Sequence, residues 1–157
     1  MSATLILATG LLVAGCGGGG SSSDATLPAA GGPGDPAKAT RTVEIKAGDD
    51  LRFQPSQVQA KVGETVTFRV VNVASMEHDF VLGDEKAQSD HEKEMQQMSS
   101  DPNHNMAAMG DEPNAIHIAP GATKEITWTF AKAGTVIYGC HEPGHYASGM
   151  KGTVTVT

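Results

Sequence analysis

The stretch YGCHEPGHYASGMKG, residues 138–152, places four metal-binding side chains in one short segment. They are Cys140, His141, His145 and Met150, which offer a thiol, two imidazoles and a thioether. Four glycines and one proline interrupt the stretch, so we expect it to form a loop and not a helix. Because thiolate and thioether groups favour soft metal ions such as copper, the loop is a candidate metal site.

Alternating apolar and polar residues predict short β-strands on both sides of this loop and along most of the chain from residue 41 onward. The clearest alternation lies in TVEIK (42–46), TVTFRV (65–70), EITWTF (125–130) and TVTVT (153–157). Shorter strands are expected at 51–53, 58–62, 78–82, 115–118 and 134–139. Seven or eight such strands, separated by glycine-containing turns, predict an all-β domain over residues 41–157 that forms a Greek-key β-sandwich or barrel.

Residues 83–114 lack this alternation and are expected to form an irregular, partly helical insert in the β domain. Ser89 is suited to cap a short helix that runs to about Met98, with Glu92 completing a capping box three residues later. We expect the remainder of the insert to be loop. An insert of this length in a small β domain is usually functional or disordered.

The N-terminal residues have the features of an export signal followed by a tether. Residues 1–15 are mostly apolar and too short for a stable membrane span, although they contain no Lys or Arg, which export signals normally carry. LVAGC at 12–16 resembles the lipobox of bacterial lipoproteins, and this resemblance implies that Cys16 is lipidated. Residues 16–40 are rich in Gly, Ser, Pro and Ala and predict a flexible linker. We therefore expect a periplasmic, membrane-anchored lipoprotein; the alternative is a cleaved soluble signal with Cys16 as a spare thiol.

The overall charge and the cysteine count narrow the expected partners. The sequence has 18 acidic and 11 basic residues and a formal net charge of −7. Nucleic acid is therefore not an expected partner, because phosphate binding needs clustered Lys and Arg. The two cysteines, Cys16 and Cys140, leave a disulfide as an alternative, but the sequences flanking each of them argue against it.

A third nitrogen ligand is available upstream of the loop. The segment SMEHDFVL, residues 75–82, places His78 at the start of a predicted strand. In the loop, Cys140, His145 and Met150 follow one another with four residues between each pair. One thiolate, two imidazoles and a weak axial thioether form the ligand set of a blue-copper site. The neutral imidazoles serve both oxidation states of copper, and the distant Met sulfur favours Cu(I) modestly.

Three segments carry a resemblance to the cupredoxins, the family of plastocyanin, azurin and rusticyanin. LRFQPSQVQAKVGETVTFRVVN (51–72) resembles the family's Phe-x-Pro segment and its following strand, EHDF (77–80) its first-histidine motif, and YGCHEPGHYASGM (138–150) its second ligand loop. The loop has the longer spacing of the rusticyanin type. The chain is more closely similar to periplasmic cupredoxin-like copper-resistance proteins, which also have a Met/His-rich insert. The resemblance covers about residues 41–157 and implies His78, Cys140 and His145 as equatorial ligands and Met150 as the axial ligand.

Two residues beside the predicted ligands, Asp79 and His141, need separate consideration. Asp79 stands where the family often has Asn, which ties the two ligand loops together. A carboxylate is also able to accept N–H groups of the loop, and its charge is expected to lower the copper reduction potential. His141 follows Cys140 directly, so its side chain should point away from the metal, and we expect it to be an exposed edge group and not a ligand.

The insert predicts a second, weaker Cu(I) site. It has eight acidic and two basic residues, no Leu, Val, Phe or Trp, and four of the seven methionines of the chain. On a helix, His91, Met95 and Met98 share one face. The other candidate ligands lie in the following loop and are His104, Met106 and Met109. The alternative is that the methionines pack the insert onto the β domain as flexible filler.

The residues leave two functions open. The first is one-electron transfer by a type 1 copper ion, with a cytochrome or another copper protein as partner and copper tolerance as the physiological context. The alternative is a protein that sequesters or delivers copper, with a copper-handling protein as partner and no role in electron transfer. We do not expect an enzyme, because one such domain lacks the His-rich sites of a second, oxygen- or nitrite-reducing copper centre.

Overall fold

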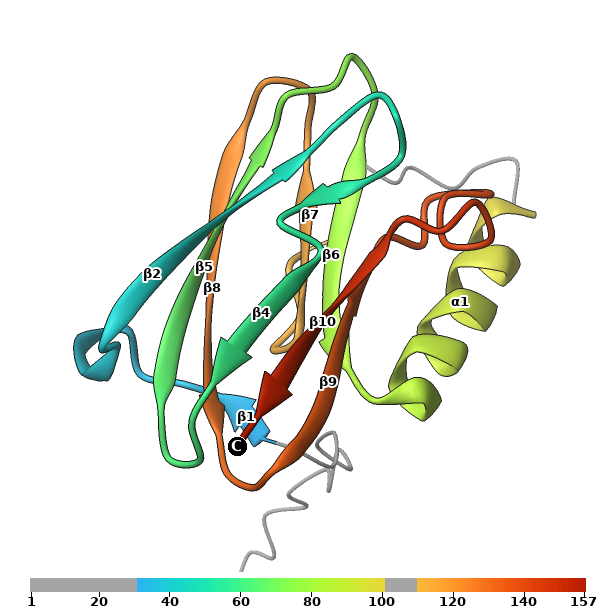
Figure 1. The fold of residues 1–157 in the computed structure, drawn as a ribbon. Coiled ribbons are helices and arrows are strands. Elements are labelled where there is room, and N and C mark those ends of the chain that lie inside the picture. Colours follow the sequence, from blue (N-terminus) through green and yellow to red (C-terminus); the bar gives the residue numbers. More distant parts are fainter. Residues whose placement is uncertain (1–30, 101–109) are drawn as a thin grey trace, which may run out of the picture.

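The computed structural model describes residues 31–100 and 110–157, whose strands form two five-stranded sheets (Figure 1). The first sheet has the order β1 (Gly31–Pro33), β8 (Thr123–Phe130), β5 (Thr65–Asn72), β2 (Arg41–Ala47) and β3 (Phe53–Gln54). The second has the order β4 (Gln57–Ala60), β10 (Lys151–Val156), β9 (Gly134–Gly139), β6 (His78–Gly83) and β7 (Ala115–Ile118). The pairs β2–β5 and β4–β10 are parallel, and all other pairs of these strands are antiparallel.

Apolar side chains from both sheets meet in one core, as the alternating pattern predicts. Five aromatic rings at its centre make edge-to-face, tilted or stacked contacts, with ring centroids 5.2–6.4 Å apart: Phe53, Phe68, Phe80, Phe130 and Tyr138. Each of these side chains is at most 1% exposed, so together they remove a large apolar area from water. The prediction of an all-β sandwich is therefore confirmed.

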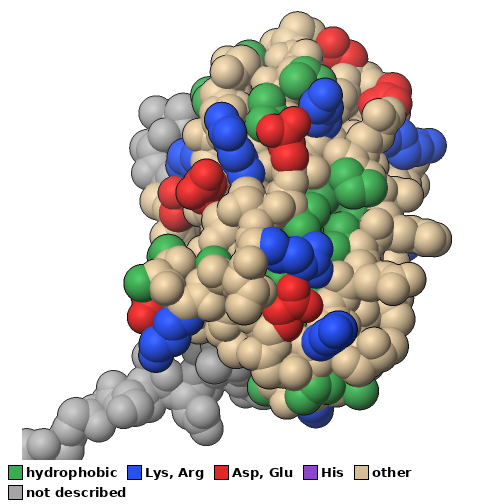
Figure 2. All heavy atoms as spheres, turned by 60° about the vertical axis from the view of Figure 1, so that its left-hand side comes forward, with side chains coloured by type: hydrophobic (Ala, Val, Ile, Leu, Met, Phe, Trp, Pro, Cys, Tyr) green, Lys and Arg blue, Asp and Glu red, His purple; other side chains and the backbone are tan. Residues whose placement is uncertain are grey.

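The outer face of the first sheet carries charges of both signs. In the strand register, Glu44 lies opposite Arg69, which lies opposite Glu125 on the next strand. Such opposite-charge neighbours across strands are favourable and leave no large field of one sign. On this side of the molecule acidic and basic side chains are interspersed and no histidine is visible (Figure 2).

The ordered domain begins earlier than residue 41. β1 pairs with β8, and a 3₁₀ turn follows at Pro36–Lys38, capped by the side chain of Asp35. Gly31 is required at the start of β1, because a Cβ there would lie only 2.2 Å from the carbonyl oxygen of Thr129. The predicted linker over residues 16–40 is thus wrong for its last ten residues. The signal over 1–15, Cys16 and the rest of the linker lie outside the described residues.

The described part of the insert contains the helix α1 (Glu85–Ser99), which packs on β6 and β9 outside the second sheet (Figure 1). Asp84 caps it by accepting a hydrogen bond from Ala87 N–H, so the predicted Ser89 cap and capping box are wrong. The helix starts directly after β6, and Ser89 lies within its second turn. Among the described residues, no helix is long and apolar enough to cross a membrane.

Candidate metal centre

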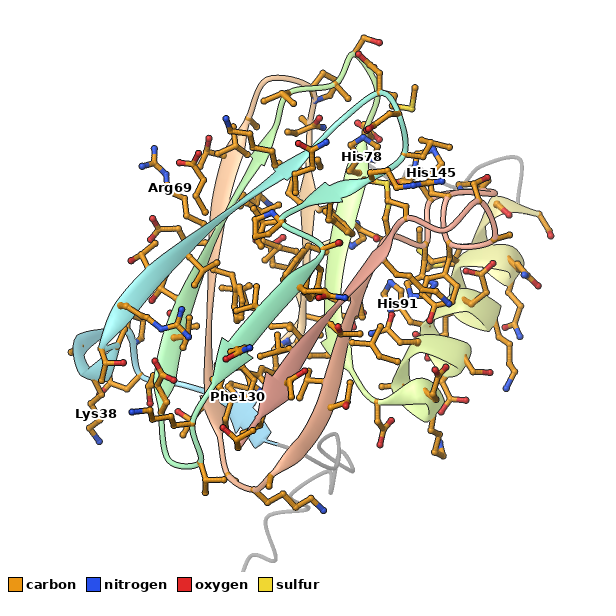
Figure 3. All side chains as sticks on the ribbon, in the orientation of Figure 1. Lys38, Arg69, His78, His91, Phe130 and His145 are labelled. Atoms are coloured by element: carbon orange, nitrogen blue, oxygen red, sulfur yellow. The ribbon has the colours of Figure 1, made fainter. Side chains whose placement is uncertain are left out.

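Three of the predicted ligands converge at one end of the sandwich. His78 begins β6, Cys140 follows β9 directly, and His145 lies in the loop between β9 and β10; His78 and His145 lie close together at this end in Figure 3. The two Nδ1 atoms are 3.2 Å apart, and Cys140 Sγ lies 3.7 Å from His78 Nδ1 and 3.3 Å from His145 Nδ1. First-row metal ions bind nitrogen and thiolate at about 2.0–2.3 Å, so three in-plane donors lie roughly 3.5–3.8 Å apart. The observed triangle is close to that size.

Burial prepares these groups as metal ligands. His78 and Cys140 are fully buried, and His145 is partly exposed. Burial lowers the pKa of both His78 and His145, which favours the neutral imidazole that binds a metal. Burial and the nearby charge of Asp79 raise the pKa of the Cys140 thiol well above its ordinary value. Without a metal the thiol therefore keeps its proton, which a bound metal ion must displace. The positive charge of the metal then stabilises the thiolate, which the apolar surroundings do not do.

Met150 closes the ligand loop and is fully buried beside it. Cys140 N–H donates to the carbonyl of Met150, and Met150 N–H donates to the carbonyl of His145, both at 3.0 Å. These two bonds fix the ends of the loop against each other, so the thioether belongs to the same structural unit as the thiol. Arg52 supports the loop from the neighbouring chain segment by donating to the carbonyl of Ser148 at 2.9 Å.

Asp79 ties the two ligand segments together. Its carboxylate accepts a hydrogen bond from His141 N–H at 2.7 Å, and its own N–H donates to Cys140 Sγ at 3.4 Å. The expectation that a carboxylate here accepts an N–H of the loop is confirmed. Hydrogen bonds to the sulfur stabilise the thiolate, and the carboxylate places a full negative charge near it. Asp79 is itself fully buried, because α1 covers this part of the sheet.

His141 is not an exposed edge group, and that expectation is wrong. It is 1% exposed and points into α1, where its Nδ1 lies 2.7 Å from Glu92 Oε2 and its Nε2 lies 2.7 Å from Gln88 Oε1. Its ring also stacks on Tyr146 with centroids 4.5 Å apart. The direction away from the metal was predicted correctly, but the sequence did not show that a helix covers this face. His141 therefore connects the ligand loop to the insert.

The inner face of α1 carries His91 and Met95, which are buried, and Met98, which is half-buried. The predicted shared face thus exists, but it is turned toward the β domain, where Met95 packs as the alternative interpretation expected. The other candidate ligands of the second copper site, His104, Met106 and Met109, lie outside the described residues. That site therefore stays a prediction.

A second group of close donor atoms includes two residues that the sequence analysis did not single out. Donor atoms of His91, Glu94 and Glu112 all lie within 4.8 Å of one another. Burial alone would lower the pKa of His91, but the charges of Asp79, Glu112 and Glu94 outweigh it and raise that pKa. The spacing of His91 and Glu94, three residues apart on a helix, was a usable signal, whereas the approach of Glu112 required the fold.

The family model of copper-binding proteins of the plastocyanin/azurin family matches residues 39–157. The chain belongs to this family, and its site of His78, Cys140, His145 and Met150 fits type 1 copper.

Relatives with copper in their names match over most of the chain. The copper-resistant cuproprotein CopI of Rubrivivax gelatinosus is 42% identical over 126 residues, which cover 80% of this chain and 72% of that protein. CopI of Pseudomonas aeruginosa is 35% identical, over 80% of this chain and 81% of that protein. Among solved structures, the reduced auracyanin of Roseiflexus castenholzii has a TM-score of 0.61 and 29% identity, covering 76% of this chain and 98% of its own. The cupredoxin fold and family predicted from the sequence are therefore confirmed.

We predict that His141→Ala weakens the fold but leaves the copper ligands in place. The change removes both contacts of this buried ring, with Glu92 and with Gln88, from the interface with α1, so the free energy of unfolding should fall by about 1–3 kcal/mol. The visible absorption band of the copper-loaded protein should keep its position, because His141 is not a ligand.

Chemical unfolding and a visible spectrum check this prediction. Gln97→Ala, an exposed change on the same helix, is the matched control and should alter neither quantity. A large shift of the band in His141→Ala would instead make His141 a ligand, and unchanged stability would mean that its contacts with α1 contribute little.

Proposed function

We propose that this chain is a one-electron carrier with a single type 1 copper ion and that it acts in copper tolerance at the periplasmic or outer face of a membrane. The observation that supports the proposal most directly is the triangle of His78 Nδ1, Cys140 Sγ and His145 Nδ1, with sides of 3.2–3.7 Å. Its donor set suits copper in both oxidation states.

The surroundings of the donors favour electron transfer over chemistry on a bound substrate. His78 and Cys140 are held by strands β6 and β9, and hydrogen bonds from Asp79 and Met150 fix the loop between the strands. A copper ion bound here supplies a site that cycles between Cu(II) and Cu(I). Because the donors are held by the fold, little rearrangement is needed when the charge changes. Of the three donors, only His145 is partly exposed, so its ring edge is the natural point of approach for a redox partner.

The context of copper tolerance is supported by the relatives. Proteins named copper-resistant cuproprotein CopI from three bacteria are 32–42% identical to this chain. The neighbour auracyanin A is described as a "blue" copper protein, and its structure has a TM-score of 0.58 to this one. The alternative function is sequestration or delivery of copper without electron transfer, which the same ligand set also permits.

A comparison of the wild type with Cys140→Ser tests the redox proposal. The copper-loaded wild type should show an intense visible band, which arises from sulfur-to-copper charge transfer, and should exchange electrons reversibly with a reduced cytochrome. Cys140→Ser should lose the band and the exchange while keeping the circular dichroism of a β domain. A band that survives the substitution would refute the ligand assignment.

Copper binding without exchange, for any cytochrome or copper-protein partner tested, would favour sequestration. Deletion of the gene distinguishes a role in copper tolerance from a role in respiration. Sensitivity to copper with normal respiration is expected for a protein of copper tolerance, and a respiratory defect without copper sensitivity would contradict that role.

We further propose that the insert binds additional Cu(I) weakly. The proposal depends on the soft side chains of the insert: His91, Met95, Met98, His104, Met106 and Met109. Under reducing conditions the wild type should bind more than one Cu(I) per chain. A variant with all four of these methionines changed to Leu should bind about one and keep its visible band. One Cu(I) in both proteins would assign the methionines to packing alone.

The membrane anchor is the last part of the proposal. If Cys16 carries the lipid, Cys16→Ala should move the protein from the membrane fraction to the soluble fraction, because acyl chains supply the binding energy. Fractionation and the mass of the mature N-terminus measure this directly. A wild-type protein that starts elsewhere than residue 16, or that carries no lipid, would rule out the lipoprotein proposal.

A further inference from the structure

The side chain of His91 is buried but lacks the hydrogen bonds that a buried imidazole normally makes. It is only 5% exposed, and its Nε2 has no hydrogen-bond partner. Its Nδ1 lies 4.0 Å from Glu94 Oε2, which is beyond hydrogen-bond distance. Nε2 is directed at a carboxylate of the β domain, whereas Nδ1 has only the more distant Glu94 near it, so Nδ1 is the nitrogen that is left for another partner.

Carboxylates lie on both sides of this ring. On the buried side, His91 Nε2 lies 3.6 Å from Asp79 Oδ2, and that oxygen also lacks a hydrogen-bond partner. On the solvent side, Glu94 and Glu112 approach the ring, and the donor atoms of His91, Glu94 and Glu112 all lie within 4.8 Å of one another. An imidazole that binds a metal through one nitrogen commonly directs its other N–H at a carboxylate, which fixes the ring and increases its basicity. Asp79 occupies that supporting position.

The scaffold holds the three donor residues in place. His91 and Glu94 lie on the same face of α1, three residues apart, and His91 projects from the helix toward the sheet in Figure 3. Glu112 lies just before β7, and two backbone hydrogen bonds with Ala115, of 2.8 and 3.2 Å, fix its backbone. The glutamate side chains are exposed, so a cation can reach them from solvent.

We propose that His91, Glu94 and Glu112 bind a divalent transition-metal cation at a second site, separate from the site of Cys140. One imidazole and two carboxylates are nitrogen and oxygen donors, which suit Zn(II) or Cu(II) and not the softer Cu(I). Water is available to complete the coordination at this partly open position. The site does not depend on the proposed electron transfer. It shares His91 with the predicted Cu(I) site, but its other donors are carboxylates and not thioethers.

Zn(II) binding to the copper-loaded protein tests this proposal. One equivalent of copper per chain is added first, so that the visible band shows the site of Cys140 to be filled without excess copper, and Zn(II) is then titrated against a competing chelator of known affinity. The wild type should bind one Zn(II) per chain. E94Q/E112Q should bind it at least about tenfold more weakly, because both oxygen donors lose their charge.

A charge-matched control separates a specific site from general attraction to an acidic protein. E44Q/E125Q removes two exposed carboxylates from the first sheet and should leave the affinity for Zn(II) unchanged. The visible band should persist in both variants, which shows that each is folded and copper-loaded. No Zn(II) binding by the wild type, or equal affinity in the wild type and E94Q/E112Q, would overturn the proposal.

Discussion

The hydrogen bond from His141 N–H to the Asp79 carboxylate, 2.7 Å long, is the contact on which the metal centre depends. It joins the strand that carries His78 to the loop that carries the other ligands, two segments about sixty residues apart in the sequence. A buried carboxylate is costly unless it is paired, and this one gains the loop N–H on one side and faces His91 on the other. The same residue therefore borders both the copper ligands and the proposed second site.

The composition of the insert follows from what α1 has to cover. The groups that contact its inner face include Asp79, the ring of His141 and two strand carbonyls. Gln88 donates to the carbonyls of Val81 and Ile137, and its oxygen lies against His141. A helix of Leu and Val would leave these groups unsatisfied. The absence of such residues, which the sequence suggested as a sign of metal binding, thus has a second cause in packing.

Local patterns were sufficient to predict the sandwich and the four ligands, because strand alternation and the spacing of Cys140, His145 and Met150 are encoded in short segments. The errors fall where distant residues decide the structure. β1 exists because Gly31 fits against β8, which no glycine-rich linker pattern reveals. The environment of His141 and the approach of Glu112 to His91 depend on where α1 and β7 lie, and a single sequence does not encode those positions in any local signal.

The pairing of β1 with β8 also fixes the end of the sandwich at which the chain enters the domain. β1 lies beside the end of β8 that contains Phe130, and Figure 3 shows Phe130 at the opposite end of the sandwich from His78 and His145. The chain therefore enters the domain at the end remote from the copper ligands. Any segment upstream of Gly31 is thus joined to the domain at the other end of the sandwich from His145.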